Sequence, residues 1–560
     1  MDKRTILAVV LSLAVLLVYQ FFFVKPPEPQ KAAAPQQSAD QVKNDKAPSS
    51  TPAATSAIAK PDLKAVAVEP EAPAQDIKVE TPLYTAVFST RGAALKSMKL
   101  KNYNQDCYKC TDDIYPLLKG FFTGSKEPVK PKTKDFVELV DVRDGMPYPL
   151  AVTFPDSSAD IAPNAVFDTA ADKLDLTNTK EKHRLVFSKT YDAVKVEKIF
   201  TFDPAGYVIG LEVKVHNLTS SPITQIPRLN WYQYVDPQKV DDYYGHDGPV
   251  ISVGGSIERQ EVKKLASEII LGPNILWGAF ESKYFIASFI PENPSLTNVV
   301  MTRDTANMVA VGMKGRKELI PGGQNSVFSY SLYLGPKQYD LLKTLGVGLE
   351  SAIDFGWFWW LAIPALYILN FLYGFVMNFG IAIIILTTII KIIFWPLGNI
   401  SYKSMNEMKK LQPKIEAMKE KYKNDQSKIG QETMALYREH KVNPFSGCLP
   451  MLIQIPVFFG LYKALMYSIE LRHSPLFFWI QDLSAPDPYY ITPIIMGATQ
   501  FISQKMTPAM GDPMQQKIML LMPVVFTFFF LNFPSGLVIY WLFNNILQIG
   551  QQYYINRKLA

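Results

Sequence analysis

Residues 375–397 read FVMNFGIAIIILTTIIKIIFWPL, and this run indicates the fold class of the chain. A helix needs about 20 predominantly apolar residues to cross the hydrocarbon core of a bilayer, and this stretch is long enough. Further apolar runs follow at about residues 445–466, 489–507, 517–533 and 535–555. We therefore predict that residues 375–560 form a core of five transmembrane helices, interrupted by a polar segment at residues 399–442.

Another apolar run opens the chain at residues 6–24, behind Lys3 and Arg4. A signal peptide starts in the same way, but its apolar region usually spans only about 7–15 residues. The longer run favours an uncleaved transmembrane anchor over residues 1–25, which makes six predicted transmembrane helices. Residues 26–77 are rich in Pro, Ala, Gln and Ser. Such a composition buries too little apolar surface to offset the entropy of ordering, so we predict a disordered linker.

The region between linker and core, residues 78–345, shows the alternation of β-strands. At residues 207–215 the odd positions are apolar, and the pattern recurs at Phe328, Tyr330, Leu332 and Leu334. Alternation with a period of two marks strands with one buried face, so we predict an all-β antiparallel sandwich. Residues 346–374 contain three closely spaced tryptophans, typical of the membrane interface. They predict an interfacial helix, broken at Pro364.

Loop charges orient the predicted bundle. Residues 399–442 carry ten Lys and Arg, whereas residues 467–488 carry only Arg472. Positively charged loops stay on the cytoplasmic side. We therefore predict a multi-pass inner-membrane protein with both termini in the cytoplasm and the β domain in the periplasm. The formal net charge of +6 over 560 residues provides no concentrated basic patch for nucleic-acid recognition.

The three cysteines do not predict a redox or metal site. Cys107 and Cys110 have CxxC spacing, and Cys448 lies far away. A loop disulfide and two idle thiols both fit the pair, while a redox site would need a βαβ context that the sequence lacks. The five histidines are scattered, so we predict no metal, no cofactor and no catalytic residue.

Polar residues recur within the predicted membrane helices. Lys391 shares one helical face with Thr387 and Thr388, because residues three and four apart are neighbours on a helix. The other predicted polar positions are Gln454, Gln500, Tyr540, Asn544 and Gln548. A charge at mid-membrane costs at least about 2.5–3.5 kcal/mol, which makes Lys391 a functional candidate. It also lies close enough to the inner interface to extend its ammonium out to water.

Two interpretations of these polar stripes stay open. They form hydrogen bonds between helices, or they line a hydrated cavity inside the bundle. The predicted spans contain no Asp or Glu, which argues against ion-coupled transport.

The polar segment at residues 399–442 predicts a hairpin of two amphipathic helices with a turn at Asn424 and Asp425. Met405, Met408 and Met418 fall on its apolar face. Because methionine is flexible and tolerates varied partners, we predict that these side chains receive substrate.

Several motifs in the core resemble one known family, the YidC/Oxa/Alb membrane insertases. They are MALY at 434–437, KVNP at 441–444, GCLPMLIQIPV at 447–457, DLSAPDPYY at 482–490, DPMQQK at 512–517 and NFPSGL at 532–537. The resemblance covers about 200 residues in order, from residue 354 onward, and the large external domain is similar to the Gram-negative type. It implies a non-enzymatic insertase and chaperone with a groove open to the cytoplasm and to lipid.

The same resemblance implies site residues and partners. Lys391 stands where the family usually has the arginine of the groove, and Thr387 and Trp541 match groove positions. Lysine keeps a positive charge but lacks the planar fork of arginine. The implied partners are nascent membrane proteins, ribosome–nascent chain complexes, the Sec translocon and the lipid bilayer. A role for the short C-terminal tail at the ribosome stays open, and a small-solute transporter and a membrane sensor are the alternative functions.

Overall fold

The structure is a computed structural model that describes residues 73–107, 135–143, 145–236, 245–423, 425–440, 442–443, 449–507 and 513–559. The predicted anchor and nearly all of the predicted linker lie outside these residues, as do Cys110 and Cys448. Cys107 is disulfide-bonded, so of the two alternatives for this cysteine the idle thiol is wrong.

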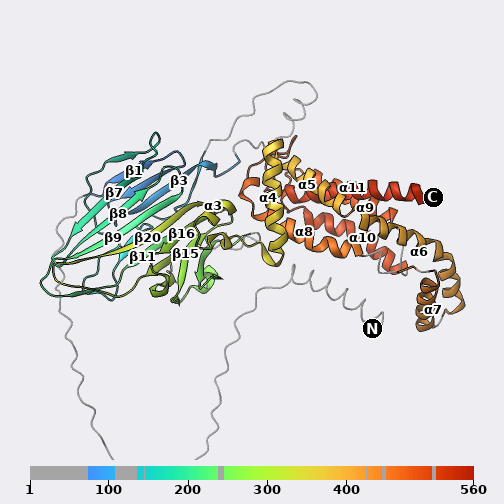
Figure 1. Cartoon of the computed structure of the whole chain (residues 1–560), viewed down its shortest axis with the longest axis horizontal. Helices are drawn as coiled ribbons and strands as arrows, with labels where there is room; N and C mark the ends of the chain where they lie inside the picture. Colours follow the sequence, from blue (N-terminus) through green and yellow to red (C-terminus); the bar gives the residue numbers. More distant parts are fainter. Residues whose placement is uncertain are drawn as a thin grey trace, which may run out of the picture. The chain divides into compact units, whose positions relative to one another are not determined.

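The β region contains one large sheet, two smaller sheets and a separate strand pair. The large sheet has the order β13 (Ser256–Arg259), β12 (Gly248–Val253), β15 (Ile275–Glu281), β16 (Phe285–Pro291), β20 (Asn325–Pro336), β9 (Val208–Asn217), β8 (Val194–Phe202) and β7 (His183–Thr190). Figure 1 shows the central strands of this sheet side by side.

The two smaller sheets have five strands each. One has the order β4 (Phe136–Glu138), β3 (Ala94–Asn104), β2 (Tyr84–Ser89), β1 (Asp76–Glu80) and β6 (Lys173–Asp175). The other has the order β14 (Ile269–Leu271), β17 (Asn298–Arg303), β18 (Met308–Lys314), β11 (Arg228–Tyr234) and β5 (Ala151–Thr153). The separate pair consists of β10 (Ile223–Gln225) and β19 (Glu318–Ile320).

Aromatic side chains join the smaller sheets to the large one. The ring of Phe88 in β2 lies 4.7 Å from that of Phe200 in β8, and the ring of Trp231 in β11 lies 5.7 Å from that of Phe289 in β16. Apart from the parallel pair β1–β6, the paired strands run antiparallel. The alternation predicted for β9 and β20 is confirmed, since the apolar side chains at the predicted inward positions are buried.

Helices follow the last strand. They are α3 (Tyr339–Thr344), α4 (Trp359–Val376), α5 (Phe379–Ile393), α6 (Trp395–Lys421), α7 (Gln426–Glu439), α8 (Leu449–Tyr467), α9 (Ile491–Met506), α10 (Pro513–Phe530) and α11 (Ser535–Leu559). Short 3-10 turns lie at η1 (Val262–Lys264), η2 (Pro294–Leu296), η3 (Leu349–Ala352), η4 (Gly356–Phe358) and η6 (Ile469–Leu471). Helix α11 packs against α5, α6, α8 and α9.

The predicted break at Pro364 is wrong, because α4 runs through this residue without interruption. Proline lacks the backbone N–H that would bond four residues back, and its ring crowds that carbonyl. Near the start of a helix the first N–H groups have no partner in any case. Pro364 is the sixth residue of α4 and lies beyond those first groups, so it removes one hydrogen bond, and the helix continues through it.

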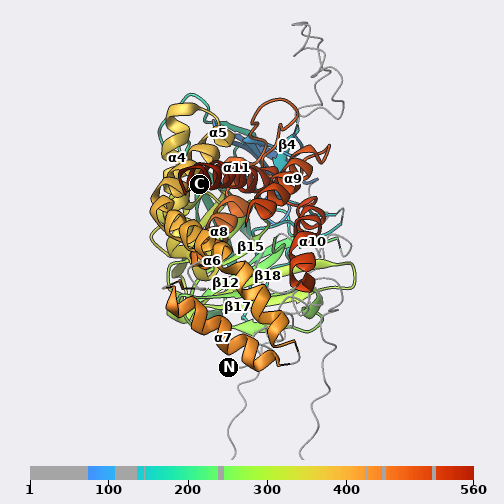
Figure 2. The ribbon, with the colours of Figure 1, turned by 90° about the vertical axis from the view of Figure 1, so that its right-hand side faces the viewer.

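The predicted hairpin is present as α6 and α7, which pack against each other (Figure 2). Asp425 caps α7, because its carboxylate accepts a hydrogen bond of 2.9 Å from the Lys428 backbone N–H. The first helix of the hairpin begins at Trp395 rather than at residue 399. It meets α5 at a bend of 60°, which the sequence analysis did not predict.

Within the described residues, Gly356–Val376 is the one helix that is long and apolar enough by itself to cross a membrane. A second crossing is counted if α5 and α6 are taken together despite their bend. Ile453–Tyr467 and Met519–Phe530 are apolar but shorter. The number of six transmembrane helices therefore stays a prediction.

Candidate functional site

Lys391 lies in the last turn of α5, directly before the bend to α6. Its side chain is half-buried, and within the described part of the chain it makes no hydrogen bond or ion pair. The next two residues, Ile392 and Ile393, are 63% and 65% exposed. A cation at this position interacts favourably with the carbonyl end of the helix. Both predicted positions of the ammonium group, in a groove and at the inner interface, stay predictions.

The two threonines beside Lys391 are satisfied within their own helix. The Thr387 hydroxyl donates to the carbonyl of Ile383 at 2.7 Å, and the Thr388 hydroxyl donates to that of Ile384 at 2.9 Å. Thr387 is buried and Thr388 is half-buried. The structure thus places both on α5 near Lys391, but neither hydroxyl is a partner of its ammonium group.

The predicted polar residues of α11 meet polar residues of three other helices. The Trp541 indole donates to the side-chain oxygen Oε1 of Gln500 in α9 at 3.2 Å. Tyr540 lies beside Gln454 of α8, and Gln548 lies beside Tyr402 of α6. Asn544 is buried in the same helix. Of the two interpretations, hydrogen bonds between helices are therefore present, and the hydrated cavity stays a prediction.

Three buried amides of α11, those of Asn545, Gln551 and Gln552, were not among the predicted site residues. The Gln551 amide donates to the Trp395 carbonyl at 3.0 Å and to the Asn399 side chain at 3.1 Å, and it fixes the start of α6. Asn545 donates to the Met496 carbonyl at 3.4 Å. The signal was available for Gln551. Steps of 3.6 residues from Tyr540 pass near residues 544, 547 and 551, so Gln551 continues the predicted stripe.

The loop between α8 and α9 contacts the start of α11. The motif at 482–490 contacts the motif at 532–537 through two backbone hydrogen bonds, from Ser535 to the Ala485 carbonyl at 2.7 Å and from Gly536 to the Leu483 carbonyl at 2.9 Å. Asp487, which is fully buried, accepts hydrogen bonds from Trp479, Tyr489 and Thr492. The two motifs thus hold the starts of α9 and α11 together.

The methionines of the hairpin differ in accessibility. Met405 and Met408 are buried, with 6% and 3% of their surface exposed, whereas Met418 is half-buried. A side chain that receives substrate must reach it, so Met418 is the most accessible of the three candidates. Substrate reception by the hairpin stays a prediction.

The comparisons with known proteins identify the family. A family model described as "60Kd inner membrane protein" matches residues 371–560, and one described as "YidC periplasmic domain" matches residues 126–368. A "Membrane protein insertase YidC" of Syntrophus aciditrophicus (strain SB) is 56% identical over 566 residues, covering 100% of both chains. The protein of the same name from Geobacter metallireducens is 42% identical and covers 100% of this chain and 99% of its own.

Among solved structures, the chain is similar to one titled "Active YidC insertase crystal structure with the first transmembrane domain resolved". The two are 22% identical, with 87% of this chain and 93% of the other covered and a TM-score of 0.36. The full-length relatives carry the assignment. This chain belongs to the YidC family of membrane protein insertases, with a β-rich periplasmic domain and a helical membrane core.

Proposed function

We propose that this chain inserts hydrophobic segments of nascent proteins into the inner membrane through a hydrated groove that carries the charge of Lys391. Membrane protein insertion follows from the family, whose members of high identity carry that name. The groove rests on one observation above all. Lys391 is half-buried beside the α5–α6 bend, and no described side chain pairs with it. An ammonium group in that position needs water or a passing carboxylate.

The arrangement suggests a sequence of physical steps. A client segment with an acidic flank enters from the cytoplasm, and Lys391 attracts the flank and lowers the cost of carrying its charge into the membrane. Water in the groove shortens the hydrocarbon path. The apolar part of the client then passes into lipid, where removal from water stabilises it by about 25 cal/mol for each Å². No covalent step is required.

The proposed topology gives this path its direction. Both termini and the hairpin lie in the cytoplasm, the β domain lies in the periplasm, and five helices follow the N-terminal anchor. We further propose that the hairpin, with Met418, meets the client first, and that ribosome–nascent chain complexes and the Sec translocon deliver clients. These partners are those implied by the family resemblance.

Substitution of Lys391 tests the role of its charge. We expect Lys391→Arg to retain insertion of a single-span client with an acidic external tail, and Lys391→Glu to lower it on the order of tenfold. Tenfold corresponds to about 1.4 kcal/mol of lost attraction. The assay is depletion of the resident insertase and rescue with each variant. Lys403→Glu is the matched control, because Lys403 is an exposed cation on the neighbouring α6. Insertion by Lys391→Glu at the wild-type level would show that the charge has no such role.

A further inference from the structure

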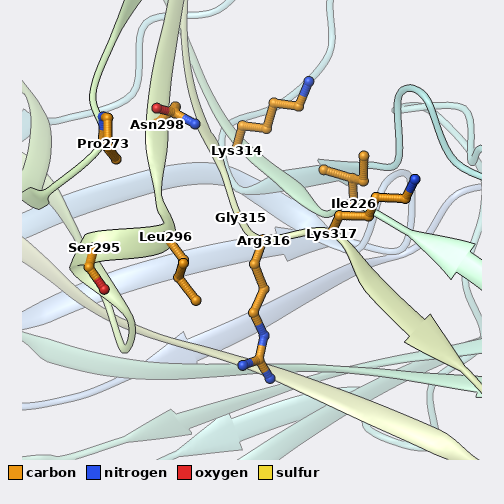
Figure 3. A pocket seen from close by; sticks show the side chains of 9 residues that line it. All are labelled: Ile226, Pro273, Ser295, Leu296, Asn298, Lys314, Gly315, Arg316 and Lys317. Atoms are coloured by element: carbon orange, nitrogen blue, oxygen red, sulfur yellow. The ribbon is translucent and has the colours of Figure 1, made fainter.

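The β domain contains a pocket of about 510 Å³ that the insertion mechanism does not use. It forms where the segment that joins β18 to β19 passes η2 and the turn after β14 (Figure 3). A pocket of this size accommodates a few amino-acid residues, since small-molecule sites occupy about 300–1,000 Å³. The residues that line it have a distinctive chemistry.

The polar side of the pocket is basic. Three of its nine lining residues, Lys314, Arg316 and Lys317, are cations, and none is a carboxylate. Lys314 pairs with Asp156 at 3.3 Å and Arg316 with Glu318 at 2.6 Å, in both cases with substantial exposure to solvent. Exposed ion pairs contribute little and exchange readily. Lys317 is exposed and makes no ion pair with any described residue.

The other side of the pocket is apolar. Ile226, Pro273 and Leu296 line it, and the side chain of Leu296 is 49% exposed. Leu319, two residues beyond Lys317, is 65% exposed. An exposed leucine, Leu296, in a pocket with three cations fits a ligand that combines carboxylates with apolar side chains.

The directions of the cations favour an extended ligand. In Figure 3, Arg316 extends alongside Leu296, whereas Lys314 and Lys317 point away from them. A single compact anion, such as a phosphate group, is best held by cations that converge on one point. Diverging cations match carboxylates that are spaced along an extended chain, whose side chains alternate in direction.

The position of the pocket favours a polypeptide over a lipid headgroup. A Cβ atom added at Gly315 would lie 3.6 Å from the Tyr330 hydroxyl, so the pocket lies beside Tyr330 of β20. From there β20 runs six residues to Pro336, and only then does the chain continue to α3 and α4. At about 3.3 Å per residue, the pocket lies roughly 20 Å along the strand from the end that leads to the membrane helices.

We propose that this pocket binds an acidic, extended polypeptide segment, with carboxylates at Lys314, Arg316 and Lys317 and an apolar side chain against Leu296. This inference rests on the proposed function, in which the bound segment is an external part of a client that has emerged from the membrane. The β domain then retains this part while the apolar segment settles in lipid.

The test measures binding of a fluorescein-labelled peptide of alternating Asp and Leu to the full chain in phosphatidylcholine nanodiscs, by fluorescence anisotropy. We expect binding that weakens as salt rises, because salt screens exposed charges. Peptides with Asn in place of Asp, or Ser in place of Leu, should bind more weakly. Lys317→Glu should weaken binding on the order of tenfold, and Leu296→Ser roughly threefold.

Lys180→Glu is the matched control, since Lys180 is an exposed cation of the same domain outside the pocket. Equal affinity of wild type and Lys317→Glu for the acidic peptide would overturn the proposal. The proposal would also be overturned if the protein bound phosphatidylglycerol vesicles but not the peptide, and if Lys317→Glu abolished this vesicle binding. Client insertion into proteoliposomes is measured in parallel. Insertion without peptide binding contradicts the pocket assignment alone, whereas peptide binding without insertion contradicts the proposed function.

Discussion

Lys198 occupies an inward-facing position of β8, where the alternation calls for an apolar side chain. Val194, Val196, Phe200 and Phe202 fill the other inward positions of the strand. The ammonium of Lys198 is inaccessible to solvent and donates to the carbonyls of Gly92 at 3.0 Å, Ala93 at 2.6 Å and Leu150 at 2.7 Å. Periodicity predicts that this position is buried. It does not predict the three carbonyls, because they come from segments distant in sequence.

Burial of Lys198 predicts a pH dependence of stability. Burial lowers the pKa of Lys198 from 10.5 to about 7. Between these values the unfolded chain binds a proton that the folded chain does not, so the free energy of unfolding rises with pH, by up to about 1.4 kcal/mol per pH unit. Below about pH 7 this contribution no longer changes with pH.

Thermal unfolding of the detergent-solubilised full chain, compared with Lys198→Met, measures this effect. We expect the wild-type melting temperature to rise relative to that of Lys198→Met between about pH 7 and pH 9. Parallel curves for the two proteins would show that Lys198 does not titrate in this range.

Among the elements, apolar runs predicted the helical segments of the core, and alternation predicted the strands β9 and β20. The bend between α5 and α6 was missed because residues 375–397 are predominantly apolar, and hydrophobicity alone carries no information on helix direction. Pro396 was the available signal, since proline suits the first turn of a new helix, and it lies there in α6. The partners of α11 were likewise out of reach, since Gln500 and Gln454 meet it only through tertiary packing.

The start of α9 depends on one carboxylate, that of Asp487. It accepts hydrogen bonds from the backbone N–H groups of Tyr489 at 2.9 Å and Thr492 at 2.7 Å, and from the Trp479 indole at 3.2 Å. Asparagine keeps one acceptor oxygen and turns an NH₂ group toward the remaining donors. We expect Asp487→Asn to destabilise the full chain by about 1–3 kcal/mol, because buried donors lose their acceptor.

Chemical denaturation of the full chain in detergent checks this expectation. Asp425→Asn is the matched control, because Asp425 caps α7 at an exposed position and asparagine is an equally good cap there. Equal stability losses in the two variants would contradict a special role for Asp487.

For the molecule as a whole, the membrane orientation is predicted from the distribution of positive charges among the loops. One residue is an apparent exception to this distribution. Arg472 is the single cation of the loop at residues 467–488, which is predicted to lie on the periplasmic side, where positive residues are disfavoured. Its guanidinium donates to the carbonyls of Asn104 and Gln105, each at 2.7 Å, and lies 5.5 Å from the ring centre of Phe285. The exception thus has a structural reason, because Arg472 joins this loop to the β domain.

The predicted orientation can be tested by labelling of introduced cysteines, in a Cys448→Ser background. Lys180→Cys lies in the β domain and Lys419→Cys on α6, and both positions are exposed. The ten cations of residues 399–442 predict a cytoplasmic hairpin and a periplasmic β domain, so we expect a membrane-impermeant maleimide to label Lys180→Cys in intact spheroplasts. Lys419→Cys should react only after the membrane is opened. Equal labelling of both positions in intact spheroplasts would place the hairpin outside, and would remove the path by which a cytoplasmic client reaches Lys391.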